Sequence, residues 1–296
     1  MGDMADDFTP RYGEVEQMAP GIRRVLARNA GAFTYYGTGT YIVGNGAVAV
    51  IDPGPDDADH VHAIRAALEG ERVSHILVTH THYDHSPAAV PLKAATGAEI
   101  VGCAPLVLDD NGPRADAGFD RDYSPDRVLT DGDVVAGSDW TIEAVATPGH
   151  TSNHLCFAYR EGEALFTGDH VMGWSTTVVS PPDGDMADYM RSLEKLLERD
   201  ERIYYPTHGA PVDNPRRLVR GMLTHRKQRE YQIVALLKEG VKHIPDMVAR
   251  MYVGLDPRLT GGAGRSVLAH LVDLKERGQV RETDGEWRLC ATSARD

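Results

Sequence analysis

Four metal-capable side chains stand within six residues, directly after a short run of β-branched and aliphatic residues. The run covers residues 76–79, and His80, His82, Asp84 and His85 follow it. The run has the length and composition of a buried strand, and in an extended chain His80 and His82 lie on the same side. Asp84 and His85 need a turn to reach that side. Titratable groups crowded in this way do not stabilise a fold unless they are paired or bind a ligand. The pattern therefore predicts a metal site at a strand end.

The two residues after this cluster are typical of a helix start. Ser86 is a good N-cap residue, and Pro87 suits the first helical position because its missing N–H is not needed there. We therefore expect a strand, a loop that carries the ligands, and then a helix.

Three further strand patterns end in a metal-capable residue beside glycine. They deliver His150 after a Pro-Gly pair, Asp169 after a glycine, and His208 before a glycine. Glycine allows tight bends of the backbone near a site. In layered α/β folds the loops at strand ends converge while the sheet stays rigid. The sequence therefore predicts that these three residues join the cluster at 80–85.

Alternation and helical spacing predict the remaining elements of this part of the chain. Residues 1–20 read as a loose acidic lead-in and residues 105–132 as a long irregular insertion. Residues 44–46 (Gly-Asn-Gly) read as a hairpin turn. Strands are expected at 22–28, 40–43, 47–51, 99–102, 141–146, 154–159, 164–166 and 202–205, and helices at 60–68, 87–95 and 185–199.

The motifs, taken in order, resemble those of the metallo-β-lactamase superfamily over roughly residues 20–215. The resemblance rests on His80-x-His82-x-Asp84-His85, Pro148-Gly149-His150-Thr151, Gly168-Asp169 and Thr207-His208-Gly209. It implies an α/β fold, the four-layer αββα sandwich, with a dinuclear metal site at one edge. No cysteine replaces a ligand, so the chain is more similar to the hydroxyacylglutathione hydrolase and lactamase-β-like-2 branches than to the thiolate-bearing lactamases.

The resemblance also implies a role for each motif residue. Asp169 would bridge the two metals, and Asp84 and Asp169 are the carboxylates to which a catalytic role is assigned. The ligands of the first metal would be His80, His82 and His150, and those of the second Asp84, His85 and His208.

Imidazole and carboxylate ligands suit zinc, and residue type alone also allows iron or manganese. Two Zn²⁺ ions would lower the pKa of bound water toward neutrality and so supply hydroxide. A metal-dependent hydrolase acting through metal-bound hydroxide follows, with a small acyl substrate as the leading hypothesis: an ester, thioester, lactone or lactam. The ligand set itself does not select the bond.

Five residues are candidates for substrate contact or for support of the ligands. Asp52 ends a strand before a sharp turn, and either forms that turn or orients a ligand. Thr151 follows a ligand and is a candidate supporting partner. His170 is either a proton donor or a histidine in the wall of the site. Trp174 and Thr176 follow Asp169 closely and are candidates for the substrate wall, with simple packing as the alternative for Trp174.

The last eighty residues predict a second, smaller unit. Helices are expected at 215–237, 244–252 and 267–277, and a hairpin at 280–289 with Asp284-Gly285 as its turn. Three helices and a hairpin predict a winged-helix-like domain. We therefore divide the chain into a catalytic domain, residues 1–215, and a C-terminal domain, residues 216–296.

Charge is distributed unevenly between these two parts. The chain carries −13 in all, with 16 basic and 10 acidic residues from Arg216 onward, a balance of +6, and a balance of −19 before it. The basic tail supports an alternative function, a single-strand endoribonuclease of the lactamase-β-like-2 type. The acidic body and the few aromatics near the basic stretch count against it. A second alternative is an iron-dependent persulfide dioxygenase, whose family members are usually shorter and lack this tail.

Other features of the 296 residues constrain the setting. No apolar run reaches the ~18 residues that span a bilayer, and the acidic start lacks a signal-peptide pattern, so we expect a cytoplasmic protein without membrane contact. The three scattered cysteines indicate neither disulfides nor a thiolate site. A winged helix also serves as a lid or dimer contact, so the oligomeric state is left open, with a homodimer as one option.

Overall fold

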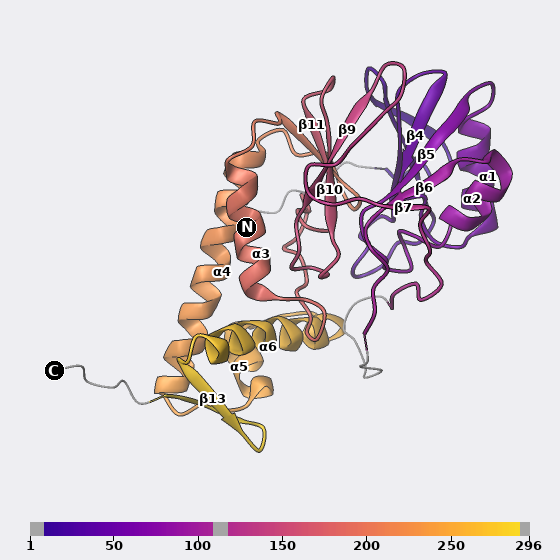
Figure 1. Ribbon diagram of the computed structural model, residues 1–296. Coiled ribbons are helices and arrows are strands. Elements are labelled where there is room, and N and C mark those ends of the chain that lie inside the picture. Colours follow the sequence, from indigo (N-terminus) through magenta and orange to yellow (C-terminus); the bar gives the residue numbers. More distant parts are fainter. Residues whose placement is uncertain (1–8, 109–117, 291–296) are drawn as a thin grey trace.

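The computed structural model describes residues 9–108 and 118–290, and two mixed β-sheets lie at its centre (Figure 1). The first sheet follows the order of the chain: β1 (Val15–Ala19), β2 (Ile22–Leu26), β3 (Gly39–Val43), β4 (Ala47–Ile51), β5 (Arg72–Val78), β6 (Glu99–Gly102) and β7 (Arg127–Val128). The second has the order β12 (Ile203–Pro206), β11 (Ala164–Gly168), β10 (Leu155–Tyr159), β9 (Thr141–Ala146) and β8 (Val134–Ala136).

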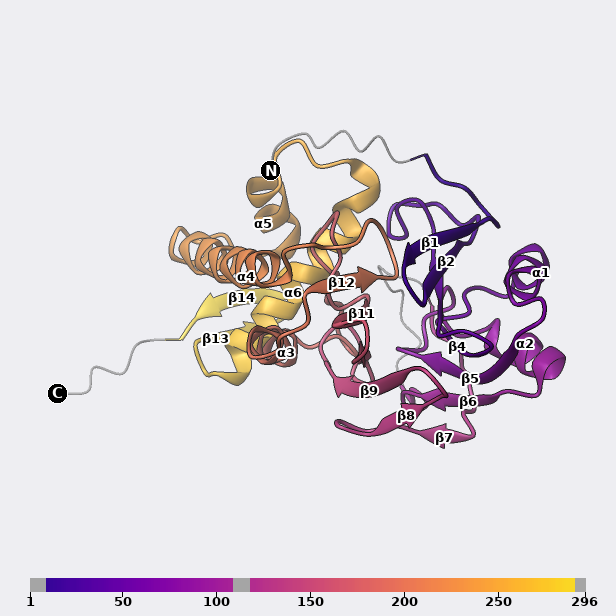
Figure 2. The same cartoon turned by 90° about the horizontal axis from the view of Figure 1, so that it is seen from above.

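Helices cover the outer face of each sheet. In Figures 1 and 2, α1 (Ala58–Ala67) and α2 (Ala89–Thr96) lie outside the first sheet, and α3 (Met186–Leu197) and α4 (Pro215–Lys238) lie beyond the second. The inner faces share one core, in which Val50 and Ile76 of the first sheet join Phe157 and Phe166 of the second. The predicted αββα sandwich is confirmed.

The outer helices dock because their apolar residues recur at helical spacing. Tyr189, Leu193 and Leu196 lie on one face of α3 and are fully buried in the same cluster as Leu165 of β11. Asp185 begins this helix as its N-cap, because its side chain accepts a 2.7 Å hydrogen bond from Asp188 N.

The C-terminal part has a hydrophobic cluster of its own. Its elements are the second half of α4, α5 (Ile244–Met251), a short 3₁₀ helix (Pro257–Leu259), α6 (Thr260–Glu276), β13 (Val280–Thr283) and β14 (Glu286–Leu289). The predicted winged-helix-like unit is confirmed in this arrangement. Because Met222 of α4 belongs to the sandwich cluster and Ile233 to the C-terminal cluster, the helix joins both parts. The division after residue 215 stays a prediction.

Three local expectations were wrong. The lead-in contains a strand, since β1 pairs antiparallel with β2. Ser86 does not cap α2: the helix begins at Ala89, and Ser86 Oγ donates to Asp120 Oδ2 instead (3.0 Å). The last long helix begins at Thr260, seven residues before the expected 267, because burial of Gly262 and Ala263 outweighs the low helix propensity of glycine.

The expected insertion at 105–132 is partly outside the described residues, which omit 109–117. Its described part is not wholly irregular, since Phe119 forms an isolated bridge with His82 and residues 127–128 form β7. Among the residues that the structure covers, helices long and apolar enough to cross a bilayer are absent.

Candidate metal centre and substrate cavity

The seven predicted ligands meet at one edge of the two sheets. The loop after β5 carries four of them, and the ends of β9, β11 and β12 are followed by His150, Asp169 and His208. Their nitrogen and oxygen atoms form two groups, within each of which all donor atoms lie within 4.8 Å of one another. The groups are His80, His82, His150 and Asp169 on one side and Asp84, His85 and His208 on the other.

Asp169 lies between the two groups. Its Oδ2 is 3.7 Å from His150 Nε2, whereas its Oδ1 is 3.3 Å from His208 Nε2 and 3.5 Å from His85 Nε2. His208 Nε2 is also 3.1 Å from Asp84 Oδ2. A carboxylate that offers one oxygen to each group has the placement that a bridging ligand requires.

Hydrogen bonds to the other ring nitrogen orient three of the histidines. His85 Nδ1 donates to Asp52 Oδ2 (2.9 Å), His150 Nδ1 to the Val178 carbonyl (2.7 Å), and His208 Nδ1 to the Gly37 carbonyl (3.1 Å). In each case the Nε2 lone pair is left facing the centre. Partners of this kind fix the tautomer and the ring plane of metal-ligating histidines.

The tautomer of His80 follows from a chain of hydrogen bonds. Thr79 Oγ1 donates to Asp52 Oδ2 (2.8 Å), so it accepts from His80 Nδ1, which lies 3.0 Å away. His80 Nε2 therefore carries a lone pair, and it lies 2.9 Å from His82 Nδ1, which is 3.1 Å from His150 Nε2. Nitrogen ligands ~2.0–2.1 Å from one zinc ion lie about this far apart.

Asp52 is completely buried and does more than form a turn. Its φ of +47° is the left-handed conformation expected of a turn residue. Its Oδ1 accepts from Thr79 N (2.8 Å), and its Oδ2 accepts from Thr79 Oγ1, His85 Nδ1 and Thr207 Oγ1. Asp52 thus connects the loop after β5 with the loop after β12.

Burial and charge act in opposite directions on the ionisable groups of the centre. Burial, and after it the neighbouring His150, lower the pKa of His82 to about 3. For His208 burial also lowers the pKa, but the carboxylates of Asp169 and Asp84 outweigh it and raise the pKa to about 10. The carboxylates of Asp169 and Asp84 thus favour positive charge at this position, which a bound cation also provides.

Two of the five supporting candidates, Thr151 and His170, form no side-chain hydrogen bond within the described residues. The Thr151 hydroxyl is buried and has no hydrogen-bond partner in the part of the chain that the structure describes, and its supporting role stays a prediction. His170 is buried against Tyr189 (ring centroids 4.9 Å apart) and is not among the residues that line the cavity. Burial lowers the pKa of His170 to about 3, so the ring is neutral and is not placed as a proton donor to a substrate.

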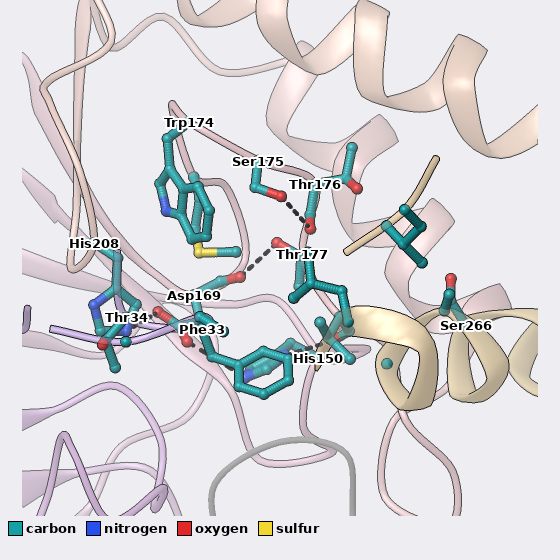
Figure 3. Close-up of a pocket in the computed structure, with 18 of the residues that line it drawn as sticks. Phe33, Thr34, His150, Asp169, Trp174, Ser175, Thr176, Thr177, His208 and Ser266 are labelled. Atoms are coloured by element: carbon teal, nitrogen blue, oxygen red, sulfur yellow. Dashed lines mark hydrogen bonds and ion pairs between the residues drawn. The ribbon is translucent and has the colours of Figure 1, made fainter. Parts of the chain in front are cut away.

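Trp174 and Thr176 line the cavity beside the centre, as expected of a substrate wall. The Trp174 indole stacks on Tyr35 at a centroid distance of 4.7 Å. Figure 3 shows Thr177 at the backbone carbonyl of Asp169, the Asp169 carboxylate facing His208 and His150, and Trp174 and Thr176 farther out along the wall.

The sequence reasoning assigned no supporting role to two residues that hold Asp169. Thr177 Oγ1 donates to the Asp169 carbonyl (2.7 Å), and His154 Nε2 accepts from Asp169 N (3.2 Å). His154 directly precedes β10, and its contact with Asp169 N explains why it is a histidine. Its place four residues after His150 was the available signal.

The cavity, of about 470 Å³, extends from the two ligand groups to α4 and α6. Ligand sites typically measure ~300–1,000 Å³. Figure 3 shows Ser266 of α6 on the opposite side of the cavity from Asp169 and His208. Much of the lining is apolar: Ala32, Phe33, Met172, Trp174, Val178, Tyr252, Leu255, Leu259 and Ala263. The sequence did not predict that the C-terminal part completes the cavity.

Comparison with known proteins gives matches over most of the chain. A family model described as Metallo-beta-lactamase superfamily matches residues 34–208, and one described as Beta-lactamase associated winged helix domain matches residues 244–287. An Atrochrysone carboxyl ACP thioesterase of Aspergillus fumigatus is 35% identical over 235 residues, which cover 77% of this chain and 69% of that protein.

Two further matches extend the comparison. A Beta-lactamase-like protein 2 homolog of Caenorhabditis elegans is 32% identical over 229 residues, 76% of this chain and 74% of that protein. The crystal structure of a beta-lactamase domain protein of Burkholderia ambifaria superposes with a TM-score of 0.77 at 20% identity and covers 96% of each chain. That likeness concerns the fold alone.

Proposed function

The chain belongs to the metallo-beta-lactamase superfamily, and from that premise we propose that it hydrolyses acyl thioesters with the help of two divalent cations. The observation that carries the proposal is the convergence of seven donor side chains, six buried and Asp84 partly buried, beside a largely apolar cavity. The choice of a thioester is supported by the name of the Aspergillus fumigatus relative, an ACP thioesterase.

The residues present fit a pair of divalent cations. Asp169 Oδ1 and His85 Nε2 are buried and lack a hydrogen-bond partner among the described residues, although both face other donor atoms. Such atoms are costly to bury unless a cation completes them. His80, His82 and His150 would hold one cation, Asp84, His85 and His208 the other, and Asp169 both.

When bound, two such cations make hydroxide available near neutral pH and stabilise negative charge that develops on a substrate oxygen. Imidazole and carboxylate donors favour zinc, with iron and manganese as the alternatives. The residues of the chain orient the ligands and shape the cavity. Asp52, Val178 O and Gly37 O hold the imidazoles in one orientation, and the apolar wall at Trp174 excludes water and receives the acyl chain.

A substrate panel with one metal-ligand variant tests this proposal. The wild type should hydrolyse acyl thioesters faster than the matched esters, lactones and lactams. His82→Ala should lose bound metal and lower kcat/KM by more than about a hundredfold. Loss of a residue that only hydrogen-bonds to a metal ligand costs up to about that factor, so loss of a ligand itself should cost more. The control is His62→Ala, an exposed histidine on α1. Full thioesterase activity in His82→Ala would refute the assignment.

The endoribonuclease alternative depends on the basic start of α4. Arg216 pairs with Asp200 (2.7 Å), and Arg217 and Arg220 are exposed and lie outside the cavity lining. This placement favours a small acyl substrate over RNA. Salt-sensitive cleavage of a labelled oligoribonucleotide, lost when these three arginines are neutralised, would reverse that order.

The persulfide dioxygenase alternative needs a single iron. Two separate groups of donors, of four and three residues, favour a dinuclear centre instead. Iron alone at one equivalent per chain, in protein purified without added metal, would support the dioxygenase and exclude the hydrolase.

A further inference from the structure

The cavity wall that lies beyond the ligand groups carries two arginines of α4, one turn apart. Arg226 and Arg229 both line the cavity, together with His225 of the same helix. Their surroundings differ from those of other arginines in the protein's interior. Arg23, Arg24 and Arg199, which are also buried or half-buried, each form an ion pair with a glutamate.

Arg226 is a buried cation that has no acidic partner among the described residues. Its side chain is 3% exposed, and its Nη1 donates to Ser266 Oγ (3.1 Å) while its Nη2 donates to the Thr177 carbonyl. Its Nε has no hydrogen-bond partner, and no carboxylate within residues 9–108 and 118–290 forms an ion pair with it. A guanidinium buried in this way is costly unless an anion accompanies it.

Arg229 presents a second guanidinium to the same space. It lies over the Tyr252 ring, 4.3 Å from the centroid, donates from Nε to His225 Nε2 (3.2 Å) and from Nη1 to the Met251 carbonyl (3.1 Å). All of these partners are uncharged groups. Burial, then the charges of Arg226 and Arg229, lower the pKa of His225 to about 4, so His225 is a neutral acceptor at pH 7.

The charge of this wall is not balanced from within the cavity. The carboxylates among the described lining residues are Asp84 and Asp169, and both belong to the candidate metal groups. Phe33, Met172 and Leu259 are among the apolar residues of the same lining. The cavity therefore combines a candidate site for two cations, an apolar lining, and two guanidinium groups that have no carboxylate of their own among the described lining residues. Ser266, which accepts from Arg226, lies opposite Asp169 and His208 (Figure 3).

We propose that Arg226 and Arg229 form a subsite for an anionic group of the substrate, a carboxylate or a phosphate, held away from the scissile carbonyl. Arginine recognises both groups through paired N–H donors, and such charge-assisted hydrogen bonds are stronger than neutral ones. The identity of the scissile bond rests on the proposed thioesterase function. The subsite itself follows from the charge of the wall and is tested separately below.

Arg226 has a second role from which the subsite must be distinguished. Through Thr177 it contacts the segment that holds Asp169, so its loss also perturbs the metal centre. A purely positional role would lower the binding of charged and neutral ligands alike. The informative quantity is therefore the ratio between an anionic ligand and its neutral match.

Binding of simple probes tests the subsite without catalysis. Octanoate, octyl phosphate and neutral octanamide are titrated into the metal-loaded protein by calorimetry. We expect at least one anion to bind about 10- to 100-fold more tightly than octanamide, the factor expected of hydrogen bonds to a charged group. In Arg229→Gln and Arg226→Gln that ratio should approach one. In Arg220→Gln, a matched arginine on the exposed side of α4, it should persist.

A paired substrate series then identifies which part of the substrate carries the anion. The first pair compares a carboxylate-ended with a methyl-ended acyl chain on a thiol without phosphate, and the second compares one neutral acyl chain on phosphopantetheine and on pantetheine. For each pair we compare kcat/KM of the anionic substrate with that of its neutral match. The pair whose ratio falls in Arg229→Gln identifies the part of the substrate that carries the anion. Equal binding of the three probes, or a ratio unchanged in both variants, would overturn the subsite. Absence of any thioester hydrolysis would overturn the proposed function and leave the binding result to decide the subsite.

Discussion

Asp52→Asn tests whether Asp52, which directly follows β4, only forms a turn or also orients His85. Asparagine tolerates the left-handed backbone that Asp52 adopts at φ +47°, so a residue that only forms a turn would accept this change at little cost. A residue that orients His85 would not. Asp52 accepts four hydrogen bonds, one at Oδ1 from Thr79 N and three at Oδ2, including that from His85 Nδ1.

An asparagine amide has one oxygen, so its NH₂ group must face a donor in either orientation. If it faces Thr79 N–H, a buried backbone hydrogen bond is lost. If the NH₂ group faces His85 instead, the imidazole must move its proton from Nδ1 to Nε2. This removes the Nε2 lone pair, which faces Asp84 Oδ2 and Asp169 Oδ1, each 3.5 Å away. Loss of one charge-assisted bond costs about 1.5–3 kcal/mol, or roughly 10- to 100-fold in metal affinity.

The assay is competition for zinc against a chromogenic chelator, together with kcat/KM for the best thioester. Asp52→Asn should weaken one of the two binding steps by that factor and leave the circular dichroism spectrum unchanged. Thr207→Val, which removes one neutral donor to the same oxygen (3.1 Å), is the matched control with a smaller expected loss. Unchanged zinc affinity in Asp52→Asn would refute the orienting role and leave the turn as its only function.

Three further predictions concern stability. Leu193→Ala, at a fully buried position of α3, should lower the free energy of unfolding by about 2–5 kcal/mol in urea titrations, and a loss below 1 kcal/mol would mean that the helix is loosely packed. Gly149→Ala should unfold the turn before His150 and lower the melting temperature together with zinc content, because φ is +134° and an added Cβ would lie 2.3 Å from Tyr189 Cα; a variant that keeps both would contradict the geometry. Burial lowers the pKa of His60 to about 4 in the folded protein, so as pH falls from about 6.5 the unfolded chain binds the proton first. The free energy of unfolding of the wild type should therefore drop toward pH 4 by roughly 3 kcal/mol more than that of His60→Gln. Parallel pH profiles of the two proteins would show that His60 titrates normally.

The sequence reasoning brought the candidate ligands together because each follows a recognisable strand. His80 to His85, His150, Asp169 and His208 all come at the point where an apolar run stops, and the structure brings these points to one edge. The same reasoning gave two roles for Asp52, a turn former or a group that orients a ligand, and the hydrogen bond from His85 Nδ1 supports the second. Strand ends are predictable in this way because alternation and glycine mark them directly in the sequence.

The parts that were not predicted depend on backbone atoms or on contacts distant in the chain. Nothing in the sequence indicates that Gly37 O or Val178 O would orient a histidine, since any residue supplies a carbonyl. The glycine-rich start of α6 reads as a loop in the sequence, and it is helical in the structure, where Gly262 and Ala263 are buried. Arg226 sits in a basic stretch that resembles a solvated surface, and its burial follows from tertiary structure alone.

Anomalous X-ray diffraction at the zinc edge, from crystals of the zinc-loaded protein, tests the central claim most directly. We predict two peaks, one among His80, His82 and His150 and one among Asp84, His85 and His208, with Asp169 between them. A single peak, or none within reach of these side chains, would contradict the dinuclear centre and the hydrolase mechanism that depends on it.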